Sequence, residues 1–363
     1  MRVGLLISGD INQQSGGYLY DRQLVSYLER QGDSVEIINL NRSSYLHDLL
    51  RSSIPRELNE LRLDILIQDE LVYPRVFNLN RRIKERLNCP LVSLVHLLDS
   101  TRPQNPLRRL IARRAERQYL LSADGVILNS EYTLRKVNAL LKDKTPPHLI
   151  AVPAANHQEP ATKQTAERYP DTRTPGLNIL YAGNVIRQKG LHVLLDALGH
   201  LDTDQFRLTV AGRLDMEPRY VKDVRKNIKH KNLQHAVRLT GPLDASDLTS
   251  CYLENHVMVL PSVHEAYGIV YLEAQRFGLP VIGTRVGGAR EIIQHGINGY
   301  LIEPGDSRSL AELLSLLLKD KEGLKDMRRN AQTYYRQHPT WDDSCARIRE
   351  FLTDIIRRKN LRE

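Results

Sequence analysis

Two glutamates, Glu265 and Glu273, stand with seven residues between them in the stretch HEAYGIVYLEA, His264–Ala274. The pattern predicts a loop and then a helix that starts near Gly268, where unpaired amides would favour a phosphate. Glu273 would lie about one turn inside the helix, and each glutamate could accept hydrogen bonds from sugar hydroxyls. This spacing suits a ligand with a phosphate in its middle and a polyol at each end, as in a nucleotide sugar. Alternatively, the two acids merely favour the start of a helix.

A glycine pair, Gly16-Gly17, follows Ser15 in a loop between an expected strand and an expected helix. Glycines in such a loop let backbone amides approach an anionic ligand, although a plain tight turn is the alternative. The loop is no G-x-G-x-x-G fingerprint, and Asn39 stands where an acid would hold a ribose. These departures disfavour an NAD site.

A second loop runs past Gly183 and places two cations, Arg187 and Lys189, just before an expected helix. Cations near a helix N-terminus could neutralise a diphosphate directly. Alternatively, they are solvated surface side chains. Further along, Gly287-Gly288 is expected to add unhindered backbone at the same edge.

The composition is that of a soluble globular enzyme, and 363 residues predict two domains. We find no apolar run long enough to span a bilayer and no signal-peptide pattern at the N-terminus. The cysteines are three in number and far apart, which fits neither a disulfide framework nor a zinc site. A cytoplasmic location, with a possible attachment to the inner face of a membrane, is therefore expected.

Strands alternate with helical patterns along both halves of the chain, which predicts two doubly wound parallel sheets in the α/β class. The polar segment 156–175 separates the halves and contains no apolar period. We predict an N-terminal acceptor-binding domain over 1–170 and a donor-binding domain over 171–340. An amphipathic helix over 341–363 is expected to pack back toward the first domain. The two domains would face each other across a cleft.

Most of the net charge of +9 comes from one segment. Residues 75–117 hold eleven Lys or Arg against three acids, a net +8. Within it, Arg102–Arg117 includes a pattern of Arg108, Arg109, Arg113 and Arg114 with Leu107, Leu110, Ile111 and Leu120. A basic amphipathic helix predicts contact with an anionic membrane surface, and a solvated helix face is the alternative. Nucleic-acid binding is disfavoured because no aromatic residues interleave the basic ones.

The stretch PSVHEAYGIVYLEAQRFGLPVIGTRVGGAREIIQHGINGYLIEPGD resembles the donor-site signature of family-4 retaining glycosyltransferases, which have the GT-B fold. The E-x7-E pair, the GLPVI strand, the GG-x-x-E turn and the PGD tail occur in the family's order. The resemblance extends over most of the chain, and it is specific for the family but not for the substrate.

The resemblance implies particular roles. Glu273 would bind the ribose, Glu265 would contact the transferred sugar, and Lys189 would neutralise the diphosphate of a UDP- or GDP-sugar co-substrate. His96 would lie at the cleft floor near donor sugar and acceptor, although a structural histidine is the alternative. The other predicted donor-site residues are Gly16, Gly17, Gly183, Asn184, Arg187, Leu243, Tyr267, Gly268, Ile269 and Val270.

Two departures from the family's pattern stand out. Asn184 replaces the usual arginine after the strand glycine, with Arg187 as a substitute nearby, and Pro153-Ala-Ala-Asn replaces a P-x-G turn. The D-x-D at Asp202–Asp204 lies in a polar connection, so no metal or other cofactor is expected. The acceptor could be a sugar, a lipid-linked glycan or a small molecule. The alternative functions are an anion-surface binding protein with a vestigial donor site and a nucleotide-sugar epimerase on the same fold.

Overall fold

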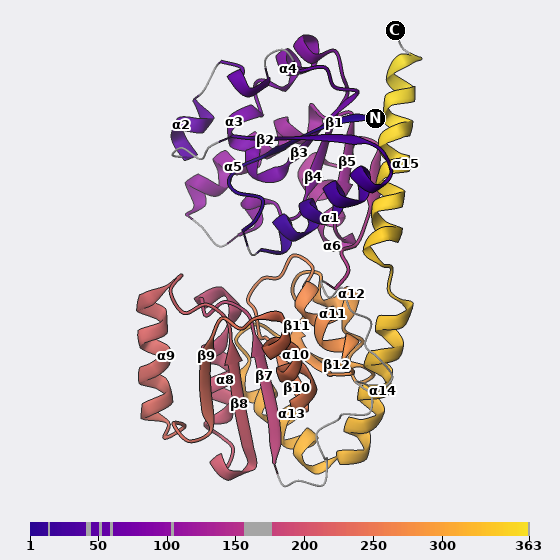
Figure 1. Cartoon of the computed structure of the whole chain (residues 1–363). Coiled ribbons are helices and arrows are strands. Elements are labelled where there is room, and N and C mark those ends of the chain that lie inside the picture. The colour runs from indigo at the N-terminus through magenta and orange to yellow at the C-terminus, as the bar shows by residue number, and fades with distance from the viewer. Residues whose placement is uncertain are drawn as a thin grey trace. The chain divides into compact units, whose positions relative to one another are not determined.

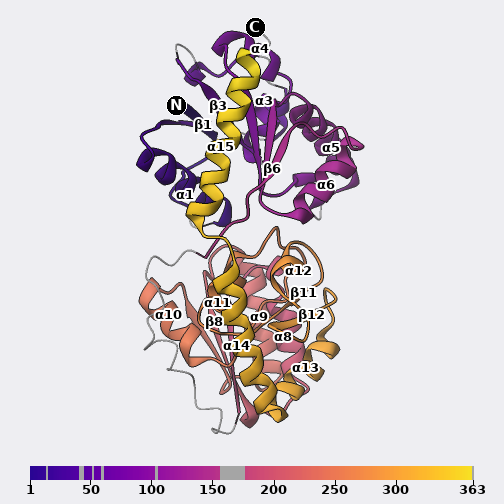
Figure 2. The same cartoon turned by 90° about the vertical axis from the view of Figure 1, so that its right-hand side faces the viewer.

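The computed structural model describes residues 1–13, 15–40, 45–50, 53–58, 61–102, 105–155 and 176–361. The chain divides into two compact units, shown in Figures 1 and 2. Unit 1 comprises Met1–Pro153 and Pro339–Glu363, and unit 2 comprises Ala154–His338. The predicted linker 156–175, together with the predicted boundary between residues 170 and 171, lies outside the described residues.

Unit 1 is built on a six-stranded sheet in the order β2-β1-β3-β4-β5-β6, with every neighbouring pair parallel. Its strands are rich in Val, Ile and Leu, as expected for a parallel sheet that is covered on both faces. The strands are β1 (Arg2–Ile7), β2 (Ser34–Asn39), β3 (Ile65–Asp69), β4 (Leu91–Val95), β5 (Gly125–Leu128) and β6 (His148–Ile150).

Two apolar cores cover the two faces of this sheet. Successive residues of β1 point to opposite faces, so that Leu5 and Ile7 enter one core and Leu6 enters the other. The first core includes α1 (Gly16–Arg30) and α15 (Trp341–Asn360). The second includes residues of α3 (Tyr73–Val76), α4 (Asn80–Leu87), α5 (Pro106–Leu121) and α6 (Glu131–Leu141). The remaining helical segments of unit 1 are α2 (Tyr45–Leu49), η1 (Arg56–Leu58), η2 (Glu70–Val72) and η3 (Asp99–Thr101).

The C-terminal helix α15 belongs to unit 1, where it packs against α1. Its buried face includes Ile348, Leu352 and Ile355. A side chain at Gly125, the first residue of β5, would meet Phe351 of this helix at 2.9 Å. The absence of a side chain at Gly125 therefore lets α15 lie close to the sheet.

Unit 2 repeats this architecture with the strand order β12-β11-β10-β7-β8-β9, again parallel throughout. The strands are β7 (Leu177–Ala182), β8 (Phe206–Ala211), β9 (Val237–Gly241), β10 (Val257–Val259), β11 (Val281–Thr284) and β12 (Gly299–Ile302). The two parallel sheets with their helices confirm the predicted α/β class.

The helices of unit 2 pack in two sets that meet where α13 contacts α14. Helix α8 packs with α9 and α13, whereas α11 packs with α12 and α14. The helical segments are η4 (Arg187–Lys189), α8 (Leu191–Leu198), η5 (Thr203–Gln205), α9 (Pro218–His230), α10 (Ala245–Glu254), α11 (Ile269–Arg276), α12 (Ala289–Ile292), α13 (Ser307–Lys319) and α14 (Lys321–Gln337). Among all described helices of the chain, none combines the length and the apolar character needed to cross a bilayer.

Candidate functional site

The strand order of unit 2 reverses between β7 and β10, its two central strands. Open α/β sheets bind their ligands beyond the carboxyl ends of the strands at such a reversal. The loop after β7 carries Lys189, and the loop after β10 carries Glu265. The topology therefore brings together a cation and an acid that the sequence places far apart.

Lys189 and Glu265 form an ion pair, with 2.6 Å between Lys189 Nζ and Glu265 Oε2. The two side chains are mostly buried, at 21% and 15% exposed. Hydrogen bonds also join the loops: the Val263 amide donates to the Gln188 carbonyl at 2.8 Å, and the Gln188 side chain donates to the His264 carbonyl at 3.0 Å. An anionic ligand that reaches Lys189 would replace the Glu265 carboxylate as its counterion.

Glycines allow these loops to pack backbone against backbone. A Cβ on Gly190 would lie 2.1 Å from the Pro261 carbonyl oxygen, and one on Gly287 would lie 1.8 Å from that of Glu265. Gly288 donates its amide to the same Glu265 oxygen at 3.1 Å. The turn at Gly287-Gly288 therefore supports the Glu265 loop, and whether its backbone also meets a ligand stays a prediction.

Helix α11 begins at Ile269, and Gly268 caps it with a φ of +103° and no side-chain hydrogen bond. The first amides of a helix have no partner within it, so those of Ile269 and Val270 suit a phosphate. The Tyr267 side chain is buried, and its hydroxyl hydrogen-bonds His338 Nε2 at 2.7 Å. Tyr267 can therefore contribute to this edge through its backbone only.

Glu273 lies in α11 and is half-buried. The Tyr252 hydroxyl donates to its Oε2 at 3.0 Å. Tyr252 is fully buried on α10 and stacks on Phe277, with 5.4 Å between ring centroids. The sequence analysis missed Tyr252, because only the fold brings α10 against α11. A tyrosine on the apolar stripe of a helix gives no separate signal.

The other predicted donor-site residues lie in loops around this edge. Gly183 and the half-buried Asn184 follow β7, and Leu243 follows β9 by two residues. The Arg187 guanidinium lies over the ring of Tyr220 on α9, 5.3 Å from the ring centroid, and its side chain is 66% exposed. Arg187 is therefore held toward α9 in this structure.

In unit 1 the strand order reverses between β1 and β3. The loop after β1 leads into Gly16 and Gly17, the first two residues of α1, and Ser15 caps this helix by accepting the Tyr18 amide at 3.3 Å. Gly17 lies against His96, since a Cβ there would be 3.2 Å from His96 Cδ2. The predicted Gly16-Gly17 loop and His96 thus share one edge of unit 1.

His96 follows β4, and the structure shows it buried among acids that the sequence analysis did not select. Its Nε2 lies 3.5 Å from both Asp21 Oδ1 and Asp69 Oδ2. The Glu70 carboxylate accepts the backbone amides of His96 and Leu97. Burial lowers the pKa of His96, but Glu70, Asp21 and Asp69 outweigh it and raise the pKa to about 9. Burial also raises the pKa of Asp69 and of Glu70.

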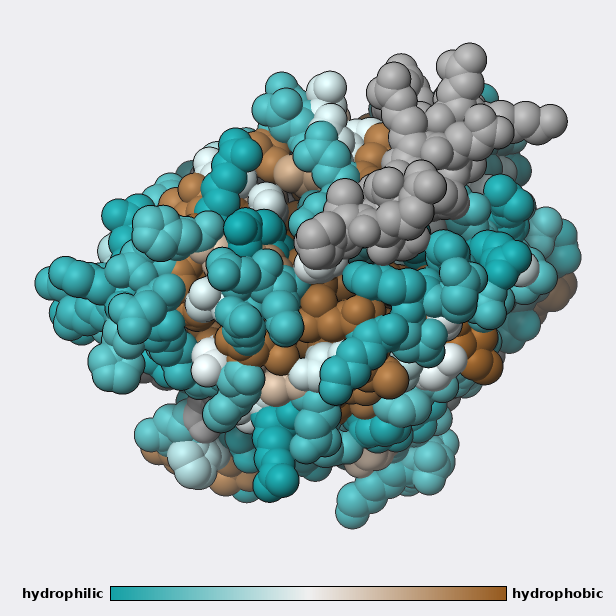
Figure 3. Space-filling model, turned by 90° about the horizontal axis from the view of Figure 1, so that it is seen from below, coloured by the Kyte–Doolittle hydropathy of each residue, from teal (hydrophilic) through white to brown (hydrophobic). Residues whose placement is uncertain are grey.

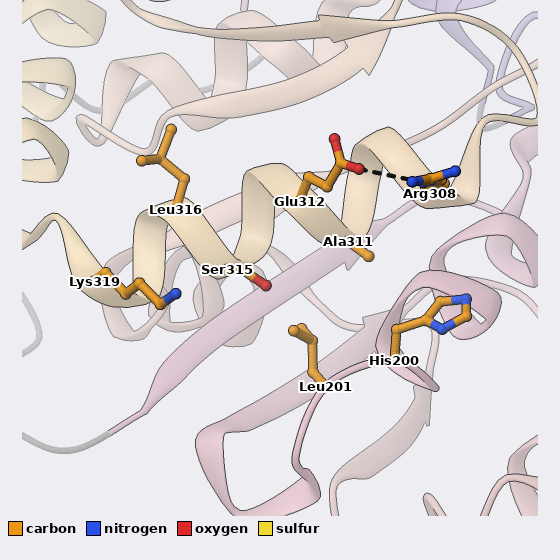
Figure 4. Close-up of a pocket in the computed structure, with 8 residues that line it drawn as sticks. All are labelled: His200, Leu201, Arg308, Ala311, Glu312, Ser315, Leu316 and Lys319. Carbon is orange, nitrogen blue, oxygen red and sulfur yellow. Dashed lines mark ion pairs between the residues drawn. The ribbon is translucent and has the colours of Figure 1, made fainter.

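A hollow of about 590 Å³ lies elsewhere on unit 2, between α13 and the turn after α8 (Figure 4). Because α8 begins at the carboxyl end of β7 and runs back along the sheet, this turn lies at the opposite edge from Lys189. Arg308 and Glu312 on its rim pair with each other at 3.4 Å.

Figure 3 shows one face of the molecule, on which hydrophilic side chains surround a smaller apolar area.

The last part of the basic segment, from residue 106 onward, lies on α5, and the exposed surface of this helix differs from the predicted one. Leu107 and Leu110 are 66% and 47% exposed, whereas Leu120 is fully buried in the core of unit 1. The arginines exposed on α5 are Arg108, Arg109, Arg113, Arg114 and Arg117. The exposed apolar part of α5 is therefore confined to its N-terminal half and its last residue, Leu121.

Curated proteins similar to this chain include glycosyltransferases. A D-inositol 3-phosphate glycosyltransferase of Thermobispora bispora is 28% identical over 76% of this chain and 67% of its own length. One with the same description from Xylanimonas cellulosilytica is 30% identical over 51% of this chain. The chain spans 44% of the length of this second relative.

Solved structures of glycosyltransferases share the fold. The sucrose-phosphate synthase of Thermosynechococcus elongatus has a TM-score of 0.79 at 20% identity, covering 98% of both chains. The Anabaena protein HepE, solved in complex with UDP-glucose, has a TM-score of 0.72 at 20% identity, covering 98% of this chain and all of its own. These neighbours confirm the GT-B type of fold.

Residues 166–334 match the family model described as "Glycosyl transferases group 1". This range contains the Lys189–Glu265 pair, α11 and Glu273. The match to this family model therefore covers the larger part of unit 2.

Proposed function

We propose that this protein is a retaining, metal-independent glycosyltransferase of family 4. It would move a hexosyl group from a nucleotide-diphosphate sugar, a UDP- or GDP-sugar, to an acceptor hydroxyl. The acceptor would be a glycan, a lipid-linked sugar or a small molecule. The observation that carries this proposal is the Lys189–Glu265 pair beside the start of α11 and at the strand reversal of unit 2.

The diphosphate, the ribose and the transferred sugar of the donor each have a counterpart at this edge. The diphosphate would lie against the amides of Ile269 and Val270 and against the Lys189 ammonium group. The ribose hydroxyls would bind Glu273, whose other carboxylate oxygen is held by Tyr252. Glu265, released from its ion pair with Lys189, would accept hydrogen bonds from the hydroxyls of the transferred sugar.

The reaction would break the bond between the sugar C1 and the phosphate oxygen and form a bond from C1 to the acceptor oxygen on the same face. The acceptor proton would pass to the departing phosphate oxygen. Negative charge grows on the diphosphate as the bond breaks. Lys189 and the helix amides, which are fixed before the reaction, would stabilise this charge. These groups supply the charge that a metal ion supplies elsewhere, so activity should persist in EDTA.

A panel of UDP-, GDP- and ADP-sugars tests the proposal, with binding and slow hydrolysis measured in the absence of acceptor. We expect one donor to bind and to release its nucleoside diphosphate. Conversion of a donor into a free isomer would instead indicate an epimerase. Failure of every donor to bind would indicate a vestigial site and contradict the proposal.

We also propose that α5 attaches the protein to an anionic membrane surface, at the inner face of the membrane, where a lipid-linked acceptor would be available. The proposal rests on the exposed Leu107 and Leu110 beside the arginines of the same helix. Apolar side chains that insert at the interface and cations that bind anionic headgroups are typical of interfacial helices.

A further inference from the structure

Asp21 is a buried acid in the second turn of α1. Its side chain is fully buried, and neither carboxylate oxygen has a hydrogen-bond partner among the described residues. An ionised group in such a place is costly unless another charge compensates it. The nearest group of opposite potential charge is the His96 ring, with Nε2 at 3.5 Å from Asp21 Oδ1.

Asp69 approaches the same nitrogen from a different element. It ends β3, and its Oδ1 accepts the Leu71 amide at 2.7 Å. Its Oδ2 is left to face His96 Nε2 at 3.5 Å. Glu70 next to it is occupied otherwise, since both of its oxygens accept backbone amides of His96 and Leu97. Glu70 thus fixes the backbone of the turn, while the two aspartates face the ring.

The ring has little freedom to turn away. Gly17 lies against its Cδ2 edge, and the Tyr20 ring packs against it edge to face, with 5.1 Å between centroids. A ring nitrogen between two carboxylates is favoured in its protonated form, because an unprotonated nitrogen would direct its lone pair at the carboxylate oxygens. An imidazolium has two N–H donors, so one can point to the aspartates while the other remains for a ligand.

We propose that Asp21 and Asp69 are positioning residues that hold His96 as an imidazolium cation beside the Gly16-Gly17 loop. The proposal deepens the proposed function and rests on it for its consequence. His96 Nδ1–H would be a permanent donor to an oxygen of the acceptor. In a neutral histidine whose Nε2 keeps the proton between the aspartates, Nδ1 would have a lone pair and could only accept, so the interaction would vary with pH.

The charged and titratable groups around the ring agree with this assignment. Glu70 after β3, Asp21 on α1 and Asp69 at the end of β3 raise the pKa of His96 against the effect of its burial. Arg102 acts on Glu70 rather than on the ring. The phenol of Tyr20 also lies close, but its hydroxyl donates to the Ala151 carbonyl at 2.7 Å.

A divalent cation could in principle take the place of the proton, because the ligand atoms of the three residues lie within 4.8 Å of one another. The proposal therefore needs a measurement that separates a protonated ring from a metal-bound one. Chemical shifts of the ring nitrogens make this distinction, and they require neither a donor nor an acceptor.

The test is a pH titration of the histidine ring nitrogens by NMR in the ligand-free, full-length protein. A His96→Gln variant identifies the His96 signals among the twelve histidines. We expect imidazolium shifts for His96 across pH 6 to 8, unchanged by EDTA. Asp21→Asn and Asp69→Asn should each move its titration midpoint down by about one pH unit or more, because burial then dominates. Asp64→Asn, which changes an aspartate bonded to Arg2, should leave it unchanged.

A neutral His96 ring at pH 7 in the unmodified protein would overturn the proposal, even if neither variant folds. Metal-type shifts that disappear with EDTA would also overturn it and assign the cluster to a cation. An unchanged titration midpoint of His96 in both aspartate variants would likewise overturn the proposal. Because no nucleotide sugar is present, none of these outcomes depends on whether the protein is a glycosyltransferase.

Discussion

The two units place different chemistry at equivalent edges of similar sheets. In unit 2 the edge carries an ion pair, Lys189 with Glu265, whose members neutralise each other and remain partly exposed. In unit 1 the edge carries three acids around one histidine, and all four are buried. A charge-balanced pair that solvent still reaches can exchange a partner for a ligand, whereas a buried excess of acid retains protons. The comparison suggests a binding edge in unit 2 and a proton-holding edge in unit 1.

The two edges also differ in how their loops are held. In unit 2, glycines let the loops meet backbone to backbone, as at Gly190 and Gly287. In unit 1, side chains hold the loops instead. Asn39 Oδ1 accepts the Gly9 amide at 3.0 Å, and Glu70 accepts the amides of His96 and Leu97. Substitutions should therefore act differently at the two edges: the unit 2 edge should be sensitive to added side chains at its glycines, and the unit 1 edge to the loss of side-chain hydrogen bonds.

The largest expected effect comes from removing the cation of the unit 2 edge. Lys189→Met should lower kcat for donor cleavage by about 100-fold to 1,000-fold, because the departing diphosphate loses a preorganised positive charge. Steady-state kinetics with the best donor of the panel measures this. Arg187→Met is the matched control, since Arg187 is held toward α9, and it should change kcat by less than about fivefold. An equal loss of kcat in both variants would contradict the assignment of the diphosphate contact to Lys189 rather than Arg187.

Gly287→Ala should reveal the backbone packing of the unit 2 edge. The new Cβ would meet the Glu265 carbonyl at 1.8 Å, and the residue has a φ of +85°. Overpacking and backbone strain together should lower the free energy of unfolding by about 3 kcal/mol. Gly296→Ala, with a φ of +81° and open space around it, should cost only about 1 kcal/mol. Calorimetry compares the two, and similar losses would show that packing on Glu265 contributes little.

Tyr252→Phe should weaken donor binding more than it slows the chemistry. Without the phenol, Glu273 loses a buried hydrogen bond and a fixed position, which corresponds to about a tenfold rise in KM. The control is Tyr334→Phe, which removes a hydrogen bond to the Glu291 carbonyl but leaves Glu273 untouched. A fall in kcat at constant KM would contradict a positioning role for Tyr252.

The smallest effect concerns α5, away from both edges. Arg113→Gln should weaken binding to vesicles that contain anionic lipid by about fivefold, because each basic residue near such a surface contributes about 1 kcal/mol. Added salt should reduce the remaining affinity. Arg219→Gln on α9 is the control with an equal change in charge. Equal binding to neutral vesicles, or none to either kind, would exclude α5 as an anionic-membrane contact.

The fold and the unit 2 edge could be predicted from sequence because their signals are local. Apolar runs define the strands, and Glu265 and Glu273 lie on one short loop and helix. The unit 1 cluster could not be predicted in the same way, because Asp21, Asp69 and His96 come from three elements that only the strand order brings together. One signal was available: Asp69 stands at the carboxyl end of a buried strand, where chemistry often lies in such sheets. The arrangement on α5 was only partly predicted, since periodicity alone did not show that Leu120 faces the core.

The central claim is that unit 2 holds a nucleotide-diphosphate sugar by its charged middle and its ribose. Isothermal titration calorimetry of the best donor against Lys189→Met/Glu273→Gln, with Arg187→Met as control, tests it most directly. The account predicts at least about a hundredfold loss of affinity in the double variant, corresponding to a lost charge contact and a lost ribose contact. The control should bind nearly as well as the unmodified protein. Undiminished affinity in the double variant would contradict the account.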